Sequence, residues 1–378
     1  MREVHATDRS PLAVAEICFS RSWSSLEHYF VETTLLLSRR GHKVVPLVYP
    51  RSPIANALTE ARLPPIPIKS RRYFSPVASR RMVQVFHEHS ITSVHLHRTQ
   101  DLGPALYAAD HAAVPTRVLM LQMESDRKKR DPYHRWVFKR LTTVLTVTDR
   151  MRWLVQRNVA VDPDKVRTLY YGFDLEKIWG EADPPDHIRW RWNLPDESFV
   201  VGLAGRLEPP MGQETLLRAA ALLIGRIPGL TVMLVGAETA GQKCEEERLK
   251  RLVRKLAPSL PVIFTGYQSP PGCIIPGFDV AVLASRKEAF GRVVVEAMAL
   301  GVPVIGTDAG GVPEIISDRI NGLLAPSDDP PALAAAIEKL YRSRELRAEM
   351  IREGLKTVAD KFSIRTHLDG LETALRGE

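Results

Sequence analysis

Short apolar runs alternate with amphipathic stretches along the whole chain, and this order predicts an α/β protein in which helices separate parallel strands. Residues 13–19 read as a first strand. Residues 26–41 read as a helix, because Leu26, Phe30 and Leu37 recur at helical spacing and Gly41 stands where the helix should end. Further strands of the first half are expected at 43–49, 91–97 and 116–122.

The second half continues the pattern, with strands expected at 198–205, 279–285 and 302–306 and a helix that begins at Gly291. At 378 residues the chain exceeds a typical single core, which predicts two domains. The stretch 179–196 is rich in Pro, Asp and Trp and is the expected connection between them. No G-x-G-x-x-G sequence follows the first strand, which argues against a dinucleotide-dependent dehydrogenase.

Glu288 and Glu296 stand on either side of the junction between the loop 286–290 and the helix that Gly291 opens. Such a junction exposes unpaired backbone N–H groups and the positive end of the helix dipole, which attract anions. Glycine leaves room for a phosphate, and carboxylates accept hydrogen bonds from sugar hydroxyls. The junction therefore predicts a site for a negatively charged, hydroxyl-rich ligand. The alternative is that both glutamates are merely solvated, because this spacing is common by chance.

The stretch 288–326, EAFGRVVVEAMALGVPVIGTDAGGVPEIISDRINGLLAP, resembles the donor-site segment of the retaining family 4 glycosyltransferases, also called glycosyl transferases group 1. Five further stretches agree with that family in order and spacing: 38–48, 170–174, 201–223, 231–237 and 261–267. The resemblance implies a GT-B fold, in which two Rossmann-like doubly wound domains face a cleft. It assigns 1–180 and a terminal helix at about 352–378 to an acceptor-binding domain, and 181–351 to a nucleotide-sugar donor-binding domain.

Members of this family move a sugar from a nucleoside-diphosphate sugar to a hydroxyl group, with retention of configuration and without a metal or another cofactor. The resemblance therefore implies a hexosyl-type transferase. Its acceptor would be a glycan, a lipid-linked sugar or a small molecule, in cell-envelope or secondary-metabolite glycan biosynthesis. The nucleotide sugar is the expected donor, and the sequence does not identify its base or sugar.

The resemblance also gives roles to individual residues. Glu288 and Arg206 are the expected catalytic residues: Glu288 stabilises positive charge in an oxocarbenium-like transition state, and Arg206 steadies the leaving diphosphate. Glu296 would hold the ribose hydroxyls, and base contacts would come from loop backbone near Gly266 and Tyr267. The full expected donor-binding set is Gly205, Arg206, Phe290, Gly291, Arg292, Glu296, Gly266 and Tyr267.

One position departs from the family in a way that bears directly on activity. The family usually has a lysine five residues after Arg206, and this chain has Met211, which brings no charge to a leaving diphosphate. Either another cation substitutes, with Arg292 and Lys287 nearest in sequence, or the activity is weak or absent. Two alternatives to a transferase therefore stay open. One is a nucleotide-sugar-binding partner subunit with degenerate catalysis, and the other is a GT-B sugar-nucleotide epimerase.

The first half of the chain matches the family more loosely. Gln122 stands roughly where the family often has a histidine, Tyr171 replaces an asparagine, and Ser24 and Ser25 stand where a Gly-Gly pair is usual. The two serines can offer hydroxyl and backbone donors to a phosphate, but a helix-capping serine explains them equally well. The expected acceptor-side residues are Ser24, Ser25, Gln122 and His97.

His95 and His97 lie two positions apart, so both point to one face of a predicted strand. A zinc site needs further ligands, and we find no cysteine or acidic residue placed to complete it. We therefore expect a packed or acceptor-side pair of histidines. No metal centre and no cofactor are expected in this protein.

The net charge of +8 is unevenly divided, with +11 on residues 1–180 and −3 on residues 181–378. A basic run at 126–140 surrounds Tyr133, Trp136 and Phe138. It fits either an amphipathic helix on an anionic membrane or a site for a phosphorylated acceptor. The alternative is a solvated helix with its aromatic face in the core. No nucleic-acid-binding module accompanies the charge, so nucleic acid is not an expected partner.

Three cysteines without a C-x-x-C pair indicate a reducing compartment. No apolar run reaches the length of about 18 residues that a transmembrane helix needs. The charged N-terminus also lacks the apolar stretch of a signal peptide. The simplest expectation is a cytoplasmic enzyme, with peripheral contact to the inner face of the plasma membrane through 126–140.

Overall fold

The computed structural model describes residues 10–71, 73–124, 128–238, 244–268 and 270–378. The chain divides into two compact units. The first unit is Met1–Tyr170 with Arg365–Glu378, and the second unit is Tyr171–Ile364. The sequence-based boundaries lay at 180/181 and 351/352, so residues 171–180 and 352–364 fall in the second unit. The assignment of acceptor and donor binding to the two units stays a prediction.

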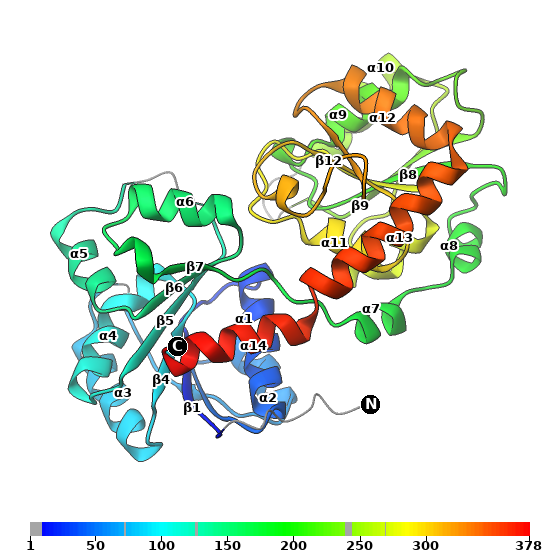
Figure 1. The fold of residues 1–378 in the computed structure, drawn as a ribbon. Coiled ribbons are helices and arrows are strands. Elements are labelled where there is room, and N and C mark those ends of the chain that lie inside the picture. The colour runs from blue at the N-terminus through cyan, green and yellow to red at the C-terminus, as the bar shows by residue number, and fades with distance from the viewer. Residues whose placement is uncertain (1–9, 72, 125–127, 239–243, 269) are drawn as a thin grey trace. The chain divides into compact units, whose positions relative to one another are not determined.

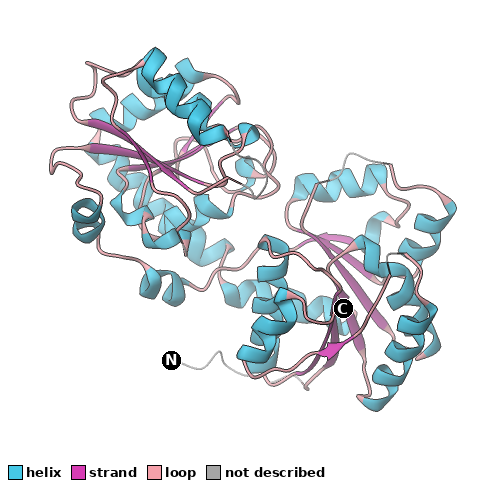
Figure 2. Cartoon of the chain, turned by 180° about the vertical axis from the view of Figure 1, so that it is seen from behind, coloured by secondary structure: helices cyan, strands magenta, loops and turns pink. Residues whose placement is uncertain are grey.

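The first unit is built on a seven-stranded parallel sheet with the order β3-β2-β1-β4-β5-β6-β7, and helices cover both faces (Figures 1 and 2). Its strands are β1 Ala13–Cys18, β2 Lys43–Val48, β3 Ile66–Pro67, β4 Ser93–Leu96, β5 Thr116–Leu121, β6 Thr143–Thr146 and β7 Val166–Thr168. Its helices are α1 Ser25–Arg39, α2 Pro53–Glu60, α3 Pro76–Glu88, α4 Leu102–His111, α5 Pro132–Lys139, α6 Asp149–Asn158 and α14 Ile364–Arg376, with short 3₁₀ turns η1 Thr99–Asp101 and η2 Pro163–Lys165.

The second unit has a six-stranded parallel sheet with the order β10-β9-β8-β11-β12-β13. Its strands are β8 Phe199–Ala204, β9 Leu230–Val235, β10 Val262–Phe264, β11 Val280–Leu283, β12 Val304–Thr307 and β13 Leu323–Ala325. Its helices are α7 Leu175–Glu181, α8 Pro185–Arg191, α9 Gln213–Ala221, α10 Glu245–Leu256, α11 Arg292–Ala299, α12 Pro330–Arg342 and α13 Arg344–Lys361, with 3₁₀ turns η3 Pro209–Met211, η4 Pro271–Cys273, η5 Ile275–Gly277 and η6 Val312–Glu314. The stretch 179–196, expected as a connection, contains α8 and lies inside this unit.

Helix α1 shows how the sequence pattern becomes structure. It begins with a capping box in which Glu27 accepts from the backbone N–H of Ser24. Phe30 and Leu37, the predicted inward positions, are buried. Gly41 follows the helix with a φ of 88°, a left-handed conformation that glycine adopts without strain. Burying each large apolar side chain of this kind contributes about 1.5–3 kcal/mol.

The strand order gives both units a Rossmann-like topology, as predicted. In each sheet the winding reverses once, between β1 and β4 in the first unit and between β8 and β11 in the second. Open parallel sheets bind ligands outside the carboxyl ends of the strands at such a reversal. The loops after these four strands are therefore the places to look for a site. None of the described helices is both long enough and apolar enough to cross a bilayer.

Candidate functional site

The loops that follow β8 and β11 lie at the carboxyl edge of the second unit's sheet. Gly205 and Arg206 come directly after β8, and Ser285 and Glu288 follow β11. The two strands are hydrogen-bonded neighbours in the sheet. Parallel pairing therefore brings two predicted stretches, far apart in sequence, to one edge.

The backbone around Glu288 is held by the loop that follows β12. The N–H of Gly311 donates to the carbonyl oxygen of Glu288 at 2.9 Å. Gly310 has a φ of 62°, and a Cβ placed on it would lie 1.9 Å from that same oxygen. Only glycine fits, because any side chain would collide with the Glu288 backbone. The glycine loop after β12 therefore fixes the position of Glu288.

The Glu288 carboxyl group is partly buried, and this changes its chemistry. Burial raises the pKa of Glu288, while hydrogen bonds from the Phe290 backbone and the Ser285 hydroxyl oppose the rise without cancelling it. The Ser285 bond is long, at 3.5 Å from Oγ to Oε2. A carboxylate that has lost much of its water interacts strongly with positive charge. The site therefore suits a reaction in which positive charge develops beside Glu288.

Arg206 supplies a positive charge at the same edge. Its guanidinium is exposed, and Nη1 lies 3.1 Å from Oε1 of Glu208. The charge of Arg206 also opposes the rise in the pKa of Glu288, so the two side chains interact electrostatically. The Arg206 side chain is 67% exposed and that of Glu208 only 16%, so a phosphate can reach the guanidinium fork from solvent.

Arg292 begins α11 and packs against two aromatic rings. Its guanidinium carbon lies 4.9 Å from the ring centre of Phe173 and 5.4 Å from that of Tyr171. Its Nε lies 3.9 Å from Oε1 of Glu296. Cation–π contacts and the glutamate thus hold one cation at the beginning of α11, next to Gly291, which has a φ of 103°.

Tyr171, which replaces the family's asparagine, is a buried part of this arrangement. Its ring lies edge-on to Phe290, with 5.1 Å between centres. Burial raises the pKa of the Tyr171 hydroxyl, Arg292 lowers it, and the charge of Glu288 raises it further. These three charged or polar groups therefore share one environment. Our sequence reasoning missed this cluster, and its available signal was the aromatic composition of YYGFD at 170–174.

Met211 reaches the end of β8. A Cβ placed on Gly205 would lie 3.1 Å from the Met211 methyl carbon Cε. The position expected to carry a lysine therefore places an uncharged thioether beside Gly205. Arg292, which we named as a substitute cation, stands at α11 instead.

Gly266 and Tyr267 follow β10 on the far side of β9. The N–H of Gly236, which follows β9, donates to the Gly266 carbonyl at 3.0 Å and forms an isolated bridge. Tyr267 is exposed and a Cβ on Gly266 would face open space. The predicted base-contact segment is thus an accessible loop joined by the backbone to the loop after β9.

In the first unit, Ser24 and Ser25 stand at the start of α1 and are exposed. Glu27 is buried, and its carboxylate accepts from the hydroxyls of Ser20 and Ser24. Burial raises the pKa of Glu27, but these hydrogen bonds outweigh it and the net pKa is lowered. The structure thus places Ser24 in a helix cap, and its role toward an acceptor stays a prediction.

The expectation that no acidic residue accompanies the two histidines is wrong. Glu16 on β1 pairs in register with His95 on β4. Its Oε1 lies 2.9 Å from His95 Nδ1, its Oε2 lies 2.8 Å from His97 Nε2, and all three side chains are fully buried. The signal was a charged residue inside an apolar strand, whose partner depends on a register that the sequence does not state.

Glu16, His95 and His97 can each offer one metal ligand, with the atoms within 4.8 Å of one another. His95 Nε2 and His97 Nδ1 are buried and have no hydrogen-bond partner in the described parts of the chain. A metal on the nitrogens that face Glu16 would leave two buried N–H groups without acceptors, which is costly. Hydrogen bonding without a metal therefore accounts better for this cluster.

We predict that Glu16→Gln lowers the free energy of unfolding by about 3 kcal/mol at neutral pH, because a glutamine amide has one acceptor oxygen and leaves one of the two buried histidines without its hydrogen-bond acceptor. Chemical denaturation measures this. Glu88→Gln is the matched control, since Glu88 is exposed and 3.7 Å from Arg81, and should cost less than about 1 kcal/mol. Equal effects of the two substitutions would contradict the role of the Glu16 cluster.

The same cluster should make the protein sensitive to acid. Burial lowers the pKa of His97 to about 4, so protonation between its ordinary value of 6.5 and 4 favours the unfolded chain. For Glu16, burial raises the pKa, but the charge of His95 and both hydrogen bonds outweigh it and bring the value to about 2. Stability from Glu16 is present above 4.5 and is lost as the pH falls toward 2.

Gln122 and the basic run complete the predicted set. Gln122 directly follows β5 and is buried. Of the run at 126–140, residues 126 and 127 lie outside the described residues. In α5 the side chains of Val137 and Phe138 are in the core, as the alternative interpretation of the run expected.

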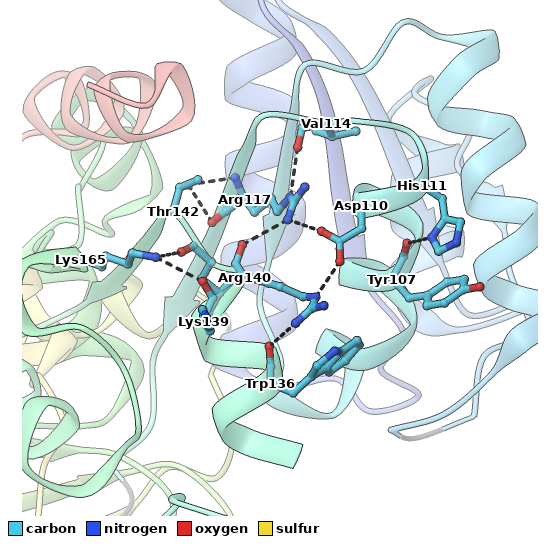
Figure 3. A network of polar contacts seen from close by, with 11 residues as sticks. Tyr107, Asp110, His111, Val114, Arg117, Trp136, Lys139, Arg140, Thr142 and Lys165 are labelled. Carbon is cyan, nitrogen blue, oxygen red and sulfur yellow. Dashed lines mark hydrogen bonds and ion pairs between the residues drawn. The ribbon is translucent and has the colours of Figure 1, made fainter. Parts of the chain in front are cut away.

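Charges of α5 also take part in the fold. Arg140 donates from Nε to Asp110 at 2.6 Å, and Arg117 binds the other carboxylate oxygen of Asp110 (Figure 3). The guanidinium carbon of Arg140 also lies 4.3 Å from the ring centre of Trp136. Lys165 donates to the carbonyl oxygens of Lys139 and Leu141, which close the end of α5. The aromatic side of α5 therefore contributes to packing, and membrane contact through 126–140 stays a prediction.

Comparisons with known proteins support the family resemblance. The model of Glycosyltransferase Family 4 matches residues 26–177, and that of Glycosyl transferases group 1 matches residues 185–357. A D-inositol 3-phosphate glycosyltransferase of Saccharomonospora viridis is 34% identical over 218 residues, 55% of this chain and 49% of that protein. The putative glycosyltransferase EpsD of Bacillus subtilis is 35% identical over 179 residues, which cover 47% of this chain and 46% of EpsD. The chain thus spans about half the length of these relatives.

Solved structures agree on the fold. HepE from Anabaena in complex with UDP and glucose superposes with a TM-score of 0.78 at 19% identity, covering 97% of this chain and 99% of that one. A glycosyltransferase from Rickettsia africae gives 0.86 at 17% identity, covering 98% and 99%. At such identities the likeness shows the fold alone. Because the two family models together match most of the chain, the protein belongs to the group 1 and family 4 glycosyltransferases and has their GT-B fold.

Proposed function

We propose that the protein transfers a sugar from a nucleoside-diphosphate sugar to a hydroxyl of an acceptor. The observation that carries the proposal is the placement of Glu288. It is fixed by the loop after β12 at the carboxyl edge between β8 and β11, with Arg206 on the neighbouring loop and α11 immediately after it. Family membership and the fold of the UDP-bound neighbour support the same reading.

In this proposal the diphosphate lies at the beginning of α11. Backbone N–H groups at Phe290 and Gly291 and the guanidinium of Arg206 would receive its negative charge. Glu296, on the next turn of α11, would accept hydrogen bonds from the ribose hydroxyls. The exposed Tyr267 loop would meet the base. We propose uracil as the base, because HepE was solved with UDP and with UDP-glucose.

Transfer breaks the bond between the anomeric carbon and the diphosphate oxygen and forms one to the acceptor oxygen. The buried carboxylate of Glu288 would stabilise the positive charge that develops on the sugar ring. We propose retention, in which the leaving diphosphate oxygen takes the acceptor proton. No protein base is then needed, so Gln122 need not replace a histidine in chemistry. Neither a metal nor another cofactor has a part in this proposal.

The acceptor is the second substrate of the proposed transfer. We propose a hydroxyl of a glycan, a lipid-linked sugar or a small molecule, bound by the first unit through the region of Ser24, Ser25 and Gln122. His97, also predicted for this role, is fully buried against Glu16 and does not reach an acceptor. One relative is named for an inositol phosphate acceptor, and a basic first half fits an acceptor with negative charge. A cytoplasmic location also stays a prediction.

Met211 motivates the second candidate, a donor-binding protein without turnover. We predict that Met211→Lys tightens UDP binding about tenfold, because it adds a charge-assisted contact to the diphosphate at the end of β8. Isothermal titration measures the affinity, and UDP release from UDP-glucose measures turnover. If the protein is a transferase, the unsubstituted protein already releases UDP from UDP-glucose. An inert protein that gains turnover as Met211→Lys is instead a degenerate enzyme, and the first candidate then fails.

A further inference from the structure

The loop that leads into α3 presents apolar side chains to solvent among positive charges. Phe74 is 77% exposed and Val77 is 81% exposed, on either side of the α3 N-cap. Lys69, Arg71 and Arg80, each within five positions of Phe74 or Val77 in the sequence, are also exposed. We call these five residues the α3 entry surface. The sequence contains no acidic residue between Glu60 and Glu88.

Helical spacing explains why the surface has this composition. Ala78, Met82 and Phe86 face the core of the first unit and are buried. Val77 and Arg80 lie on the opposite face of α3, which is polar farther along the helix. Val77 is thus an isolated apolar residue on a charged face, next to Phe74.

The neighbouring Tyr73 anchors this loop to the fold. Its N–H donates to the Gln100 carbonyl at 3.0 Å, and its ring lies edge-on to Tyr133 of α5 at 5.6 Å. A Cβ on Gly103 of α4 would lie 2.2 Å from the Tyr73 carbonyl oxygen, so the loop is pressed onto α4. Tyr73 also has a φ of 66°, which a tyrosine adopts only when its surroundings require it. The exposed Phe74 thus follows a backbone that is fixed rather than free.

We propose that the α3 entry surface docks on an anionic lipid bilayer. Phe74 and Val77 enter the boundary between headgroups and acyl chains, and the three cations contact lipid phosphates with their apolar stems along the surface. This inference goes beyond sugar transfer and does not depend on it. It also differs from the membrane contact predicted through 126–140. There the aromatic residues of α5 pack against the core, whereas Phe74 and Val77 face solvent.

A bilayer fits this surface better than a folded partner does. Two protruding apolar side chains do not form a groove or a broad patch that a protein would cover. Basic residues around an apolar tip instead complement a surface that is anionic outside and apolar within. The absence of acidic residues over this stretch of sequence removes the repulsion that would oppose such a contact.

The test is co-sedimentation of the full chain with vesicles of phosphatidylcholine, alone or mixed with phosphatidylglycerol. We expect binding only to the mixed vesicles. Phe74→Ser with Val77→Ser should weaken it by about tenfold or more, because the inserted apolar area is lost. Arg71→Gln with Arg80→Gln should weaken it and reduce its salt dependence. Trp190→Ser is the matched control, since Trp190 on α8 is 75% exposed and belongs to the second unit.

Insertion can also be observed directly. Phe74→Trp should show an added blue-shifted emission with mixed vesicles and quenching by brominated lipid, whereas the six native tryptophans of the unsubstituted protein should show neither. No binding of the parent protein to mixed vesicles overturns the proposal. So does unchanged binding of the Phe74→Ser, Val77→Ser protein, or an equal loss with Trp190→Ser. Unchanged circular dichroism and melting midpoints confirm that the exposed substitutions leave the fold intact.

Discussion

Replacing Glu288 with glutamine is expected to slow sugar transfer by about 10²–10³-fold, the range for losing one preorganised electrostatic contact to a transition state. Binding of UDP should stay within about threefold, because the substitution acts on the sugar and not on the diphosphate. UDP release from UDP-glucose measures the first quantity and titration with UDP the second. Glu349→Gln, an exposed residue 3.7 Å from Arg352, is the matched control.

The same substitution should stabilise the protein. Burial raises the folded-state pKa of Glu288, so its ionised form costs stability as the pH rises through that value. Glu288→Gln removes this cost and should raise the melting temperature at neutral pH. The pH affects activity in the opposite direction, because sugar transfer needs the ionised form of Glu288. As the pH is lowered, the transfer rate should therefore begin to fall above the pH at which an ordinary glutamate is protonated. A less stable Glu288→Gln protein with unchanged activity would contradict both assignments.

Replacing Gly310 with alanine should have the second large effect. The new Cβ would lie 1.9 Å from the Glu288 carbonyl oxygen and would sit on a left-handed backbone. We expect a loss of about 3 kcal/mol of unfolding free energy, from overpacking and strain together. Donor turnover should fall at least about tenfold, because Glu288 is displaced. Urea denaturation and the UDP-release assay measure the two effects.

Gly225→Ala is the control that distinguishes the strain of a left-handed backbone from the steric clash of a new Cβ. Gly225 has a comparable φ of 78°, but a Cβ there meets nothing within 4 Å. It should therefore cost only about 1–2 kcal/mol and leave turnover unchanged. If the two alanine substitutions cost the same stability and the same activity, then contact between Gly310 and the Glu288 backbone does not hold the site.

The local pattern of the chain was enough to predict an α/β fold with parallel sheets, and the loop–helix unit that carries Glu288 and Glu296. β11 was readable as a β-branched apolar run, and Gly291 marked the beginning of α11. Glu288 and Glu296 could be named as site candidates because both stand within one loop–helix unit, where sequence neighbours are also neighbours in space. The stretch 179–196, predicted from its composition as a connection, contains α8, because Pro185 suits the first turn of a helix.

Contacts that depend on register or on loop packing were beyond the sequence pattern. Glu16 meets His95 only because β1 pairs with β4 in a particular register, across 79 positions of sequence. Arg292 meets Phe173 through a loop that periodicity does not describe. The exposure of Phe74 depends on how the Tyr73 loop is anchored. In each case the sequence contains the residues, but only the tertiary structure shows which residues they contact.

We propose above that the second unit binds a nucleoside diphosphate at the β8–β11 edge. Thermal shift with UDP, GDP, ADP, CMP and dTDP tests it most directly, with Glu296→Ala as the site control. A nucleotide bound only by the folded protein adds about 2.7 kcal/mol at 100 times its Kd. We expect UDP to stabilise the protein and expect this stabilisation to be lost in Glu296→Ala. No shift with any of the five nucleotides, or an equal shift in both proteins, would contradict it.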